Sequence, residues 1–229
     1  MKIGITKFPG TNNEQDIVRI LNSLNAENEL LYPRDYRKLQ GFDALILAGG
    51  FSYGDYLRAG VIAARTNLID ELHDFIISEK FVLGICNGFQ MLCEANYLPG
   101  VLTTNTSTRF ISEWVNIKVN KTNSPLLKGL ESKVMRIPIA HYEGNYYNVE
   151  ESIKQLKDDS QIAFQYCNEK KVVEPMSNPN GSIANIAGIV NDKGNVLGMM
   201  PHPERASFPY LGSIDGRSIF ENLIEELKC

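Results

Sequence analysis

The segment Phe81–Gln90 constrains the fold of this chain more than any other part of the sequence. The apolar run over 81–85 predicts a buried strand, and the pattern that follows Cys86 predicts a helix. Gly84 and Gly88 leave room for a sharp turn and for close packing beneath it. Cys86 therefore stands on a strand-to-helix turn, where we expect its side chain to be exposed. The first free N–H groups of the helix would stabilise its thiolate, which is the environment of a nucleophile.

The first half of the chain alternates strands and helices. We expect strands at 1–7, 29–32, 43–48 and 81–85, and helices from residue 14 and at 67–79. Thr11 and Glu14 form the sequence pattern of a capping box at the start of the first helix. Such alternation predicts an α/β fold with a mostly parallel sheet and helices on both of its faces. Ligands bind such sheets at the carboxyl ends of the strands, where Gly50 and Cys86 fall.

The second half of the chain predicts an antiparallel section. Alternating patterns are typical of strands at 110–120, 134–140 and 161–167, and strands at 183–191 and 195–200 flank a hairpin turn. A last amphipathic helix is expected over 216–228. With 229 residues, 43% of them hydrophobic, the chain can bury one substantial core, and no linker or repeat divides it. We therefore expect a single domain, residues 1–229.

His202 is the best candidate for a base that serves Cys86. It follows an apolar strand, and Pro203 favours extended backbone at this histidine. Residues two apart in an extended segment project to the same side, so Glu204 can reach the imidazole. A cysteine, a histidine and an acidic residue are the three parts of an activated nucleophile.

The chain has two other histidines. His73 lies on an amphipathic helix, and we expect it to face solvent. His141 is followed two residues later by Glu143, so the His-x-Glu spacing occurs twice in the sequence. His141 therefore stays open as an alternative base.

A glycine-rich segment, Gly49–Gly60, follows the strand expected at 43–48. It matches neither of the common phosphate-binding patterns, and no ATP-binding motif occurs elsewhere. A glycine pair after a central strand can instead direct a backbone N–H group at a developing oxyanion. Gly50 and the N–H of Asn87, the residue after Cys86, are the candidates for these two donors. A glycine-rich connection without a ligand is the alternative.

The composition argues against several classes of protein. The formal net charge is −4 and no cluster of Lys and Arg occurs, which disfavours a nucleic-acid partner. No apolar span is long enough to cross a membrane, and the first residues predict a strand rather than a signal peptide. The four cysteines lack zinc-type spacing, so we expect no metal site and a reduced, cytoplasmic setting. Of these cysteines, we expect Cys93 to pack in the core and Cys229 to have no functional role.

Three features together resemble the class I, or triad, glutamine amidotransferases. They are the Gly84-x-Cys86-x-Gly88-x-Gln90 pattern, the Gly49-Gly50 pair and the His202-x-Glu204 pair. Longer blocks at 7–12, 50–60, 83–90 and 195–205 resemble, more narrowly, the glutaminase subunits of phosphoribosylformylglycinamidine synthase. The resemblance covers the whole chain and implies a flavodoxin-like fold. Tyr142 departs from it, because glycine is common at that position of the family.

The resemblance implies a role for each matching residue. Cys86 would be the nucleophile that attacks the carboxamide of L-glutamine, with His202 as general base and then acid. Glu204 would orient the imidazole, and Gly50 and Asn87 match the oxyanion-hole positions. Contacts with the substrate are implied for Gln90, Asn105 and Phe110.

The resemblance also implies partners. The chain would pass ammonia to a large synthetase subunit, which uses ATP and magnesium to make formylglycinamidine ribonucleotide in purine biosynthesis. A small third subunit would bridge the two, and no cofactor is expected in this chain itself. Two aromatic loops, 51–56 and 141–147, are candidate docking surfaces, although local packing would explain them as well.

Two other classes of function remain open. A stand-alone cysteine hydrolase, such as a γ-glutamyl peptidase, could use the same turn and triad and would be active without a partner. A non-catalytic relative could keep the fold alone, and a thiol-directed glutamine analogue would then fail to label Cys86.

Overall fold

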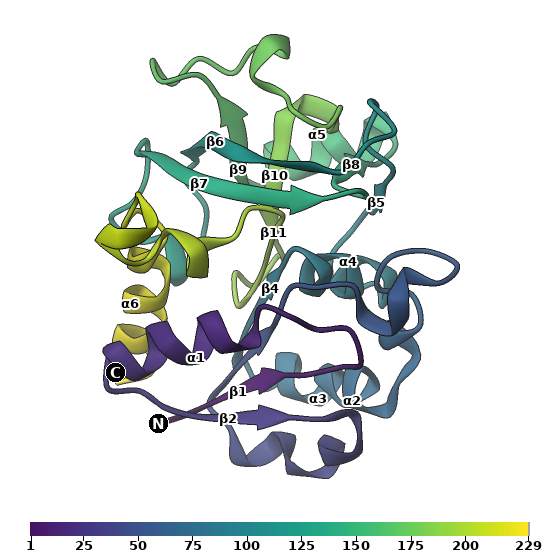
Figure 1. Ribbon diagram of the computed structural model, residues 1–229, viewed down its shortest axis with the longest axis vertical. Helices are drawn as coiled ribbons and strands as arrows, with labels where there is room; N and C mark the ends of the chain where they lie inside the picture. Colours follow the sequence, from purple (N-terminus) through teal and green to yellow (C-terminus); the bar gives the residue numbers. More distant parts are fainter. Residues whose placement is uncertain (229) are drawn as a thin grey trace.

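The computed structural model describes residues 1–228, and its main feature is one sheet of nine strands (Figure 1). The strands are β1 (Lys2–Thr6), β2 (Glu27–Leu31), β3 (Ala44–Leu47), β4 (Phe81–Ile85), β6 (Ile111–Val119), β7 (Val134–His141), β9 (Ile162–Cys167), β10 (Ile186–Val190) and β11 (Val196–Met199). Their order across the sheet is β2-β1-β3-β4-β11-β10-β9-β6-β7.

Five neighbouring strands run parallel, and helices cover both of their faces. Parallel pairing joins β2, β1, β3, β4 and β11. In Figure 1 two helices, α1 (Glu14–Ser23) and α6 (Arg217–Glu226), lie together in front of these strands, and α2 (Asn67–Asp70) and α3 (Leu72–Ile77) lie behind them. The helix expected at 67–79 is thus two short helices. β3 and β4 are almost completely buried, which explains why their sequences are apolar runs without alternation.

The antiparallel section extends the same sheet. β10 pairs antiparallel with β11 and with β9, and β6 pairs antiparallel with β9 and β7. The expected hairpin therefore forms between β10 and β11, although residues 183–185 are a 3₁₀ turn. A helix, α5 (Glu150–Asp158), and a small sheet of β5 (Val101–Thr103) and β8 (Asn145–Tyr147) complete this half. The expected α/β fold, with helices on both faces and an antiparallel section in the second half, is confirmed.

The expected capping box at the start of α1 is wrong. The hydroxyl of Thr11 accepts a hydrogen bond from the N–H of Phe8 at 3.0 Å, and Glu14 pairs with Lys7 at 2.7 Å. α1 begins at Glu14, and the residue at its N-cap, Asn13, makes no side-chain hydrogen bond to the helix. The side chain of Asn13 is used elsewhere, as described below.

A continuous apolar core joins the two halves of the sheet. It contains buried residues of the parallel strands, such as Ile5 and Leu45, and of the antiparallel strands, such as Ile117 and Phe164. Within the described residues, every helix is too short or too polar to span a bilayer.

Candidate active site

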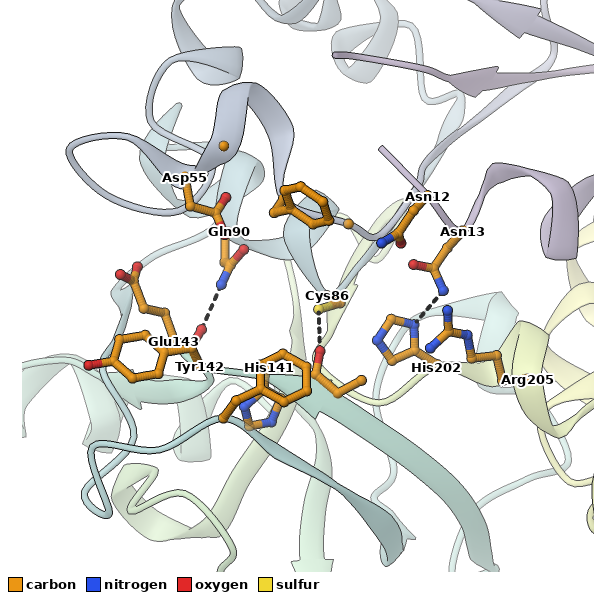
Figure 2. Close-up of a pocket in the computed structure, with 15 residues that line it drawn as sticks. Asn12, Asn13, Asp55, Cys86, Gln90, His141, Tyr142, Glu143, His202 and Arg205 are labelled. Atoms are coloured by element: carbon orange, nitrogen blue, oxygen red, sulfur yellow. Dashed lines mark hydrogen bonds between the residues drawn. The ribbon is translucent and has the colours of Figure 1, made fainter. Parts of the chain in front are cut away.

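A cavity of about 440 Å³ lies where the carboxyl ends of β3, β4 and β11 meet (Figure 2). β3 leads into Gly50, β4 into Cys86 and β11 into His202, and all three residues line the cavity. The end of β7, at Ala140 and His141, closes the opposite wall. The fold therefore brings together residues that are far apart in the chain because neighbouring parallel strands end at one edge of the sheet.

Cys86 occupies a strained turn between β4 and α4 (Asn87–Glu94). Its backbone angles are φ 51° and ψ −104°, outside the regions that a non-glycine residue ordinarily adopts. Its N–H donates to Met199 O at 2.7 Å, and its carbonyl accepts from Gln90 N–H at 3.1 Å. These two bonds hold the turn, one by tying it to the end of β11 and the other by tying it to the first turn of α4. The expectation that Cys86 is exposed is wrong, because the residue is only 4% exposed and opens into the cavity alone.

His202 and Glu204 form a buried pair beside Cys86. Nδ1 of His202 lies 2.7 Å from Oε1 of Glu204, and the two residues are 2% and 1% exposed. The predicted contact is therefore present, but the predicted extended backbone is not. Pro203–Ala206 forms a 3₁₀ turn, and this turn places the carboxylate of Glu204 next to the imidazole ring. Figure 2 shows the imidazole facing the sulfur of Cys86 across the cavity.

The surroundings of His202 favour its protonated form. Burial alone disfavours the charged imidazole, but the carboxylate of Glu204 and a thiolate at Cys86 together raise the pKa of His202. Because Nδ1 shares its proton with a carboxylate, Nε2 is the nitrogen left to take a proton from the thiol. Nε2 has no hydrogen-bond partner among the described residues. The arrangement suits a cysteine–imidazole pair.

His141 also lines the cavity, but its ring is held differently. Nδ1 lies 3.1 Å from Oδ1 of Asn105, and Nε2 lies 3.4 Å from Nδ2 of Asn180. Burial, and the charge of nearby His202, lower the pKa of His141 to about 4. The carboxylate of Glu143 accepts the Ala59 N–H at 2.9 Å rather than contacting the ring. This geometry favours His202 over His141 as the base. The remaining histidine, His73, is exposed as expected.

Gly50 lines the same cavity as Cys86, and Asn87 directly follows Cys86 in the chain; their role as an oxyanion hole stays a prediction. Gly50 has φ 142°, and a Cβ there would lie 2.7 Å from Gly10 O and 2.8 Å from Asn12 N, so only glycine fits. Asn87 is the first residue of α4, so its N–H has no acceptor within the helix. Its side chain accepts the Ser52 N–H at 3.1 Å and thereby ties the glycine loop to the helix.

The three predicted substrate contacts do not lie together. Gln90 lines the cavity, and its Nε2 donates to Glu143 O at 2.6 Å. Phe110 lines the mouth and is 63% exposed. Asn105 is 1% exposed and lies behind His141, outside the lining of the cavity. It holds the histidine by its amide oxygen, as described above, and donates Nδ2–H to His141 O at 3.0 Å.

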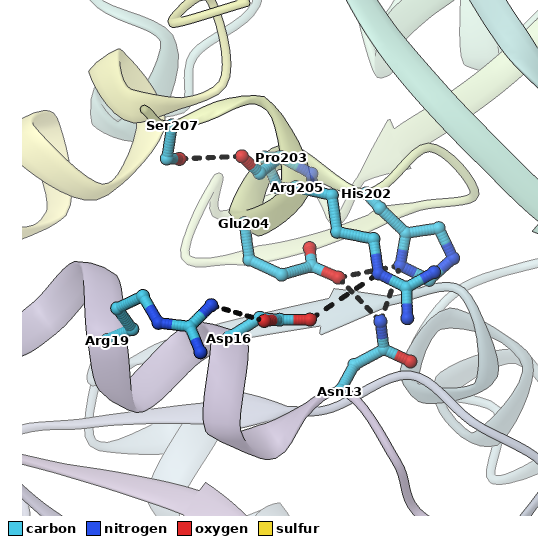
Figure 3. A network of polar contacts seen from close by, with 8 residues as sticks. All are labelled: Asn13, Asp16, Arg19, His202, Pro203, Glu204, Arg205 and Ser207. Carbon is cyan, nitrogen blue, oxygen red and sulfur yellow. Dashed lines mark hydrogen bonds and ion pairs between the residues drawn. The ribbon is translucent and has the colours of Figure 1, made fainter. Parts of the chain in front are cut away.

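Sequence reasoning gave no role to four polar residues that line the cavity, Asn12, Asn13, Asp55 and Arg205, and it considered Glu143 only as a partner of His141. Asn13 follows β1, which ends at the same edge of the sheet, so its position after a parallel strand was the available signal. Asp55 belongs to the glycine-rich segment after β3, and Glu143 follows β7. Figure 3 shows the amide of Asn13 directed at both His202 and Glu204.

The described residues contain no group of three or more His, Cys, Asp or Glu arranged to hold a metal ion. Cys93 is buried in α4, as expected, and it and Cys167 are free thiols. Cys229 lies outside the described residues.

Comparison with known proteins assigns the family. Residues 1–219 match the CobB/CobQ-like glutamine amidotransferase domain. Proteins called "Phosphoribosylformylglycinamidine synthase subunit PurQ" from Aquifex aeolicus and Methanosarcina mazei are 45% and 46% identical to this chain, over 99% and 98% of its length and 100% and 97% of theirs. A chain of the solved "Structure of PurLQS from Thermotoga maritima" superimposes with a TM-score of 0.86 at 35% identity, over 99% of this chain and 98% of that one. This chain therefore belongs to the CobB/CobQ-like glutamine amidotransferases and, within them, to the family of phosphoribosylformylglycinamidine synthase subunits called PurQ.

Proposed function

We propose that this chain is the glutaminase subunit of phosphoribosylformylglycinamidine synthase. The observation that carries the proposal is the placement of Cys86 and His202 on one cavity, with Nε2 of the imidazole free and Nδ1 bound to Glu204. The family membership supplies the substrate, L-glutamine, and the pathway, purine biosynthesis. We further propose that the chain acts as one amidotransferase domain.

The cavity supports a thioester mechanism. His202 takes the thiol proton through Nε2, and the sulfur of Cys86 attacks the carboxamide carbon of glutamine. The oxyanion that forms accepts hydrogen bonds from the N–H groups of Gly50 and Asn87, and one such donor is typically worth about 3 kcal/mol. The imidazolium returns its proton to the departing nitrogen, which leaves as ammonia. Water, activated by the same ring, then releases glutamate from the γ-glutamyl thioester.

The ammonia has to reach an acceptor on another subunit. Free ammonia in neutral water is mostly protonated and is then no nucleophile, so a docked synthetase subunit is required. We propose that ATP and magnesium act in that subunit and that a small third subunit bridges the two. The free thiols of this chain fit a reducing compartment, and we place the complex in the cytoplasm.

Exposed apolar side chains at the mouth of the cavity are the proposed docking surface for the synthetase. Phe51, Phe110 and Tyr142 line the cavity and are 52%, 63% and 46% exposed, and Tyr56, in the same loop as Phe51, is 75% exposed. A group of this kind on a protein surface is typical of an interface. A partner seated here would cover the opening through which the ammonia leaves.

The test uses the chain assembled with its synthetase partners. Cys86→Ala should abolish synthesis of the amidine from glutamine, while synthesis from added ammonium salt continues. Cys93→Ala is the matched control, since Cys93 lies on the same helix but does not line the cavity. Loss of both activities in Cys86→Ala, or full glutamine-dependent activity in it, would contradict the proposal. High glutaminase activity of the chain without its partners would favour a stand-alone hydrolase instead.

A further inference from the structure

A second imidazole stands beside the proposed reacting pair. His141 lines the same cavity as Cys86 and His202 and is 3% exposed. The carbonyl of the residue before it, Ala140, accepts a hydrogen bond from Sγ of Cys86 at 3.8 Å, and Figure 2 shows this contact. A histidine so close to a thiol can compete for its proton or add a second positive charge to the site. The protonation state of His141 therefore matters for the reaction.

Asn105, between β5 and β6, shows where the proton of His141 lies. Its Oδ1 accepts the backbone N–H of Gly144 at 3.1 Å, so this atom has to be the oxygen of the amide. Its Nδ2 donates to two carbonyl oxygens, those of Arg109 at 2.9 Å and of His141 at 3.0 Å. The same Oδ1 lies 3.1 Å from Nδ1 of His141. Because an oxygen acceptor requires a donor opposite it, Nδ1 carries a proton.

Asn180, between β9 and β10, shows that the other ring nitrogen carries none. Asn180 is fully buried, and its Oδ1 accepts from the N–H and the hydroxyl of Ser182, at 3.1 Å and 2.7 Å. Its Nδ2 therefore faces Nε2 of His141, at 3.4 Å, and also donates to Gly144 O at 2.8 Å. A donor opposite Nε2 requires a lone pair there. The two amides thus specify one form of the ring, the neutral tautomer with its proton on Nδ1.

Packing and charge around the ring favour the same form. A Cβ on Gly144 would collide with Cε1 of the imidazole, so the backbone packs directly against the ring and leaves it no room to turn. Burial, and the charge of nearby His202, lower the pKa of His141 to about 4. At neutral pH the ring is therefore uncharged.

The other titratable groups around the ring do not reverse this preference. Tyr166 lies behind Asn180, with its hydroxyl 3.2 Å from Nδ2, and burial raises the pKa of this hydroxyl, so it stays uncharged. The carboxylate of Glu143 accepts a backbone N–H instead of contacting the ring. A thiolate at Cys86 acts on His202, whose pKa it raises. Charge in this part of the cavity is thus directed to one histidine and not to the other.

We propose that His141 is a positioning residue, which two asparagines lock as a neutral imidazole so that His202 alone carries positive charge beside Cys86. The inference rests on the proposed function, because it takes Cys86 and His202 as the reacting pair. A protonated ring at His141 would destabilise the imidazolium of His202 by repulsion. A loose ring would release the backbone that presents Ala140 O to the thiol. The lock prevents both.

Nuclear magnetic resonance of the chain labelled with ¹⁵N at histidine tests the assigned form of the ring without any need for activity. The chain has three histidines, and the variants His73→Gln and His202→Gln identify the signals. Between pH 6 and pH 8, His141 should show one protonated and one unprotonated ring nitrogen, with the proton on Nδ1. An imidazolium pattern, the tautomer with its proton on Nε2, or a titration within this range would overturn the inference.

Replacement of Asn180 should change that form. Asn180→Asp places an acceptor and a negative charge opposite Nε2, so His141 should become an imidazolium at pH 7, and kcat for glutamine in the assembled complex should fall about 10- to 100-fold. Asn178→Asp is the matched control, because it adds the same charge in the same loop, and its oxygen keeps the bonds from the N–H groups of Asn180 and Gly181. This control should keep the neutral pattern. A neutral ring, or an imidazolium with full activity, in Asn180→Asp would contradict the inference.

Replacement of His141 itself separates a positioning residue from a base. Asparagine keeps a donor for Oδ1 of Asn105 and cannot take a proton, so His141→Asn should lower kcat only about 3- to 10-fold. His141→Ala also removes that donor and should lower kcat about 10- to 100-fold. Equal losses in these two variants, or turnover in His141→Asn as low as in His202→Ala, would overturn the assignment. If wild type and Cys86→Ala release ammonia from glutamine equally, it is the proposed function that fails, and the resonance spectrum still decides the form of His141.

Discussion

Nδ2 of Asn13 lies 3.0 Å from Oε1 of Glu204, the same oxygen that receives the hydrogen bond from Nδ1 of His202 (Figure 3). Asn13 is 2% exposed, and the other oxygen of Glu204 has no partner among the described residues. The amide is therefore one of two groups that stabilise a buried carboxylate. This is why Asn13 stands at the N-cap of α1 without capping it. A residue that departs from a local rule is often a functional one.

Asn13→Ala should lower kcat for glutamine about 10- to 100-fold, because a lost hydrogen bond to a buried charge is worth about 1.5–3 kcal/mol. The glutamate would then be free to rotate away from the ring, and the imidazolium would lose part of its stabilisation. Asn13→Asp should be more severe, because it places a like charge beside Glu204. Steady-state rates across pH measure both effects. An unchanged pH profile in both variants would mean that Asn13 serves only the fold.

A separate prediction concerns how much glutaminase activity is lost when each of the three triad residues is replaced. Cys86→Ala and His202→Ala remove the nucleophile and the base, and each should abolish measurable turnover of glutamine. Glu204→Gln leaves both groups in place and disturbs only the orientation and charge of the ring, so we expect a smaller loss, roughly 10²- to 10⁴-fold. Single-turnover rates in the assembled complex can rank the three variants. A larger loss in Glu204→Gln than in His202→Ala would contradict the assignment of the base.

The strands and the position of the nucleophile could be predicted because they follow from local patterns. The apolar run before Cys86 is β4 itself, Phe81–Ile85, residue for residue. Gly84 and Gly88 also have their predicted packing role, since a Cβ on Gly84 would lie 2.5 Å from Leu92 Cδ1. The sequence pattern predicts the observed structure here because a buried parallel strand requires apolar residues and a sharp turn requires small ones.

The rest of the site could not be predicted because it depends on tertiary contacts. Asn13 resembles an ordinary helix cap until Glu204, nearly two hundred positions later, is brought beside it. Asp55 and Glu143 likewise come from different strand ends. The burial of Cys86 depends on β7, which closes over the cavity from the antiparallel half. A position after a parallel strand indicates that a residue lies near the site, but the sequence does not say which side chains it will contact there.

Asp55→Asn should stabilise the protein at neutral pH. The pKa of Asp55 is raised to about 6 in the fold, from an ordinary value of 3.8, so the charged form is disfavoured when the chain is folded. The cost is absent below pH 3.8, grows as pH rises toward 6, and is complete above it. We expect a gain of about 1 kcal/mol at pH 7, since solvent still reaches this half-buried carboxyl. Urea unfolding at pH 7 and pH 4 measures it, and a gain of equal size at both values would argue against a charge effect.

Gly88→Ala sets helix propensity against packing beneath the nucleophile. Gly88 lies in the first turn of α4, where alanine is favoured by up to about 1 kcal/mol on propensity alone. A Cβ at this position would collide with the carbonyl oxygen of Leu47 and lie 2.7 Å from its Cβ, and the backbone of β3 cannot move aside. We expect the packing clash to outweigh the gain in helix propensity, so that the free energy of unfolding falls by roughly 2–3 kcal/mol. We also expect glutaminase activity to fall. Gly41→Ala is the matched control, because a Cβ there meets nothing within 4 Å. Urea denaturation of the two variants compares them, and equal stabilities would show that β3 and α4 separate more readily than this contact implies.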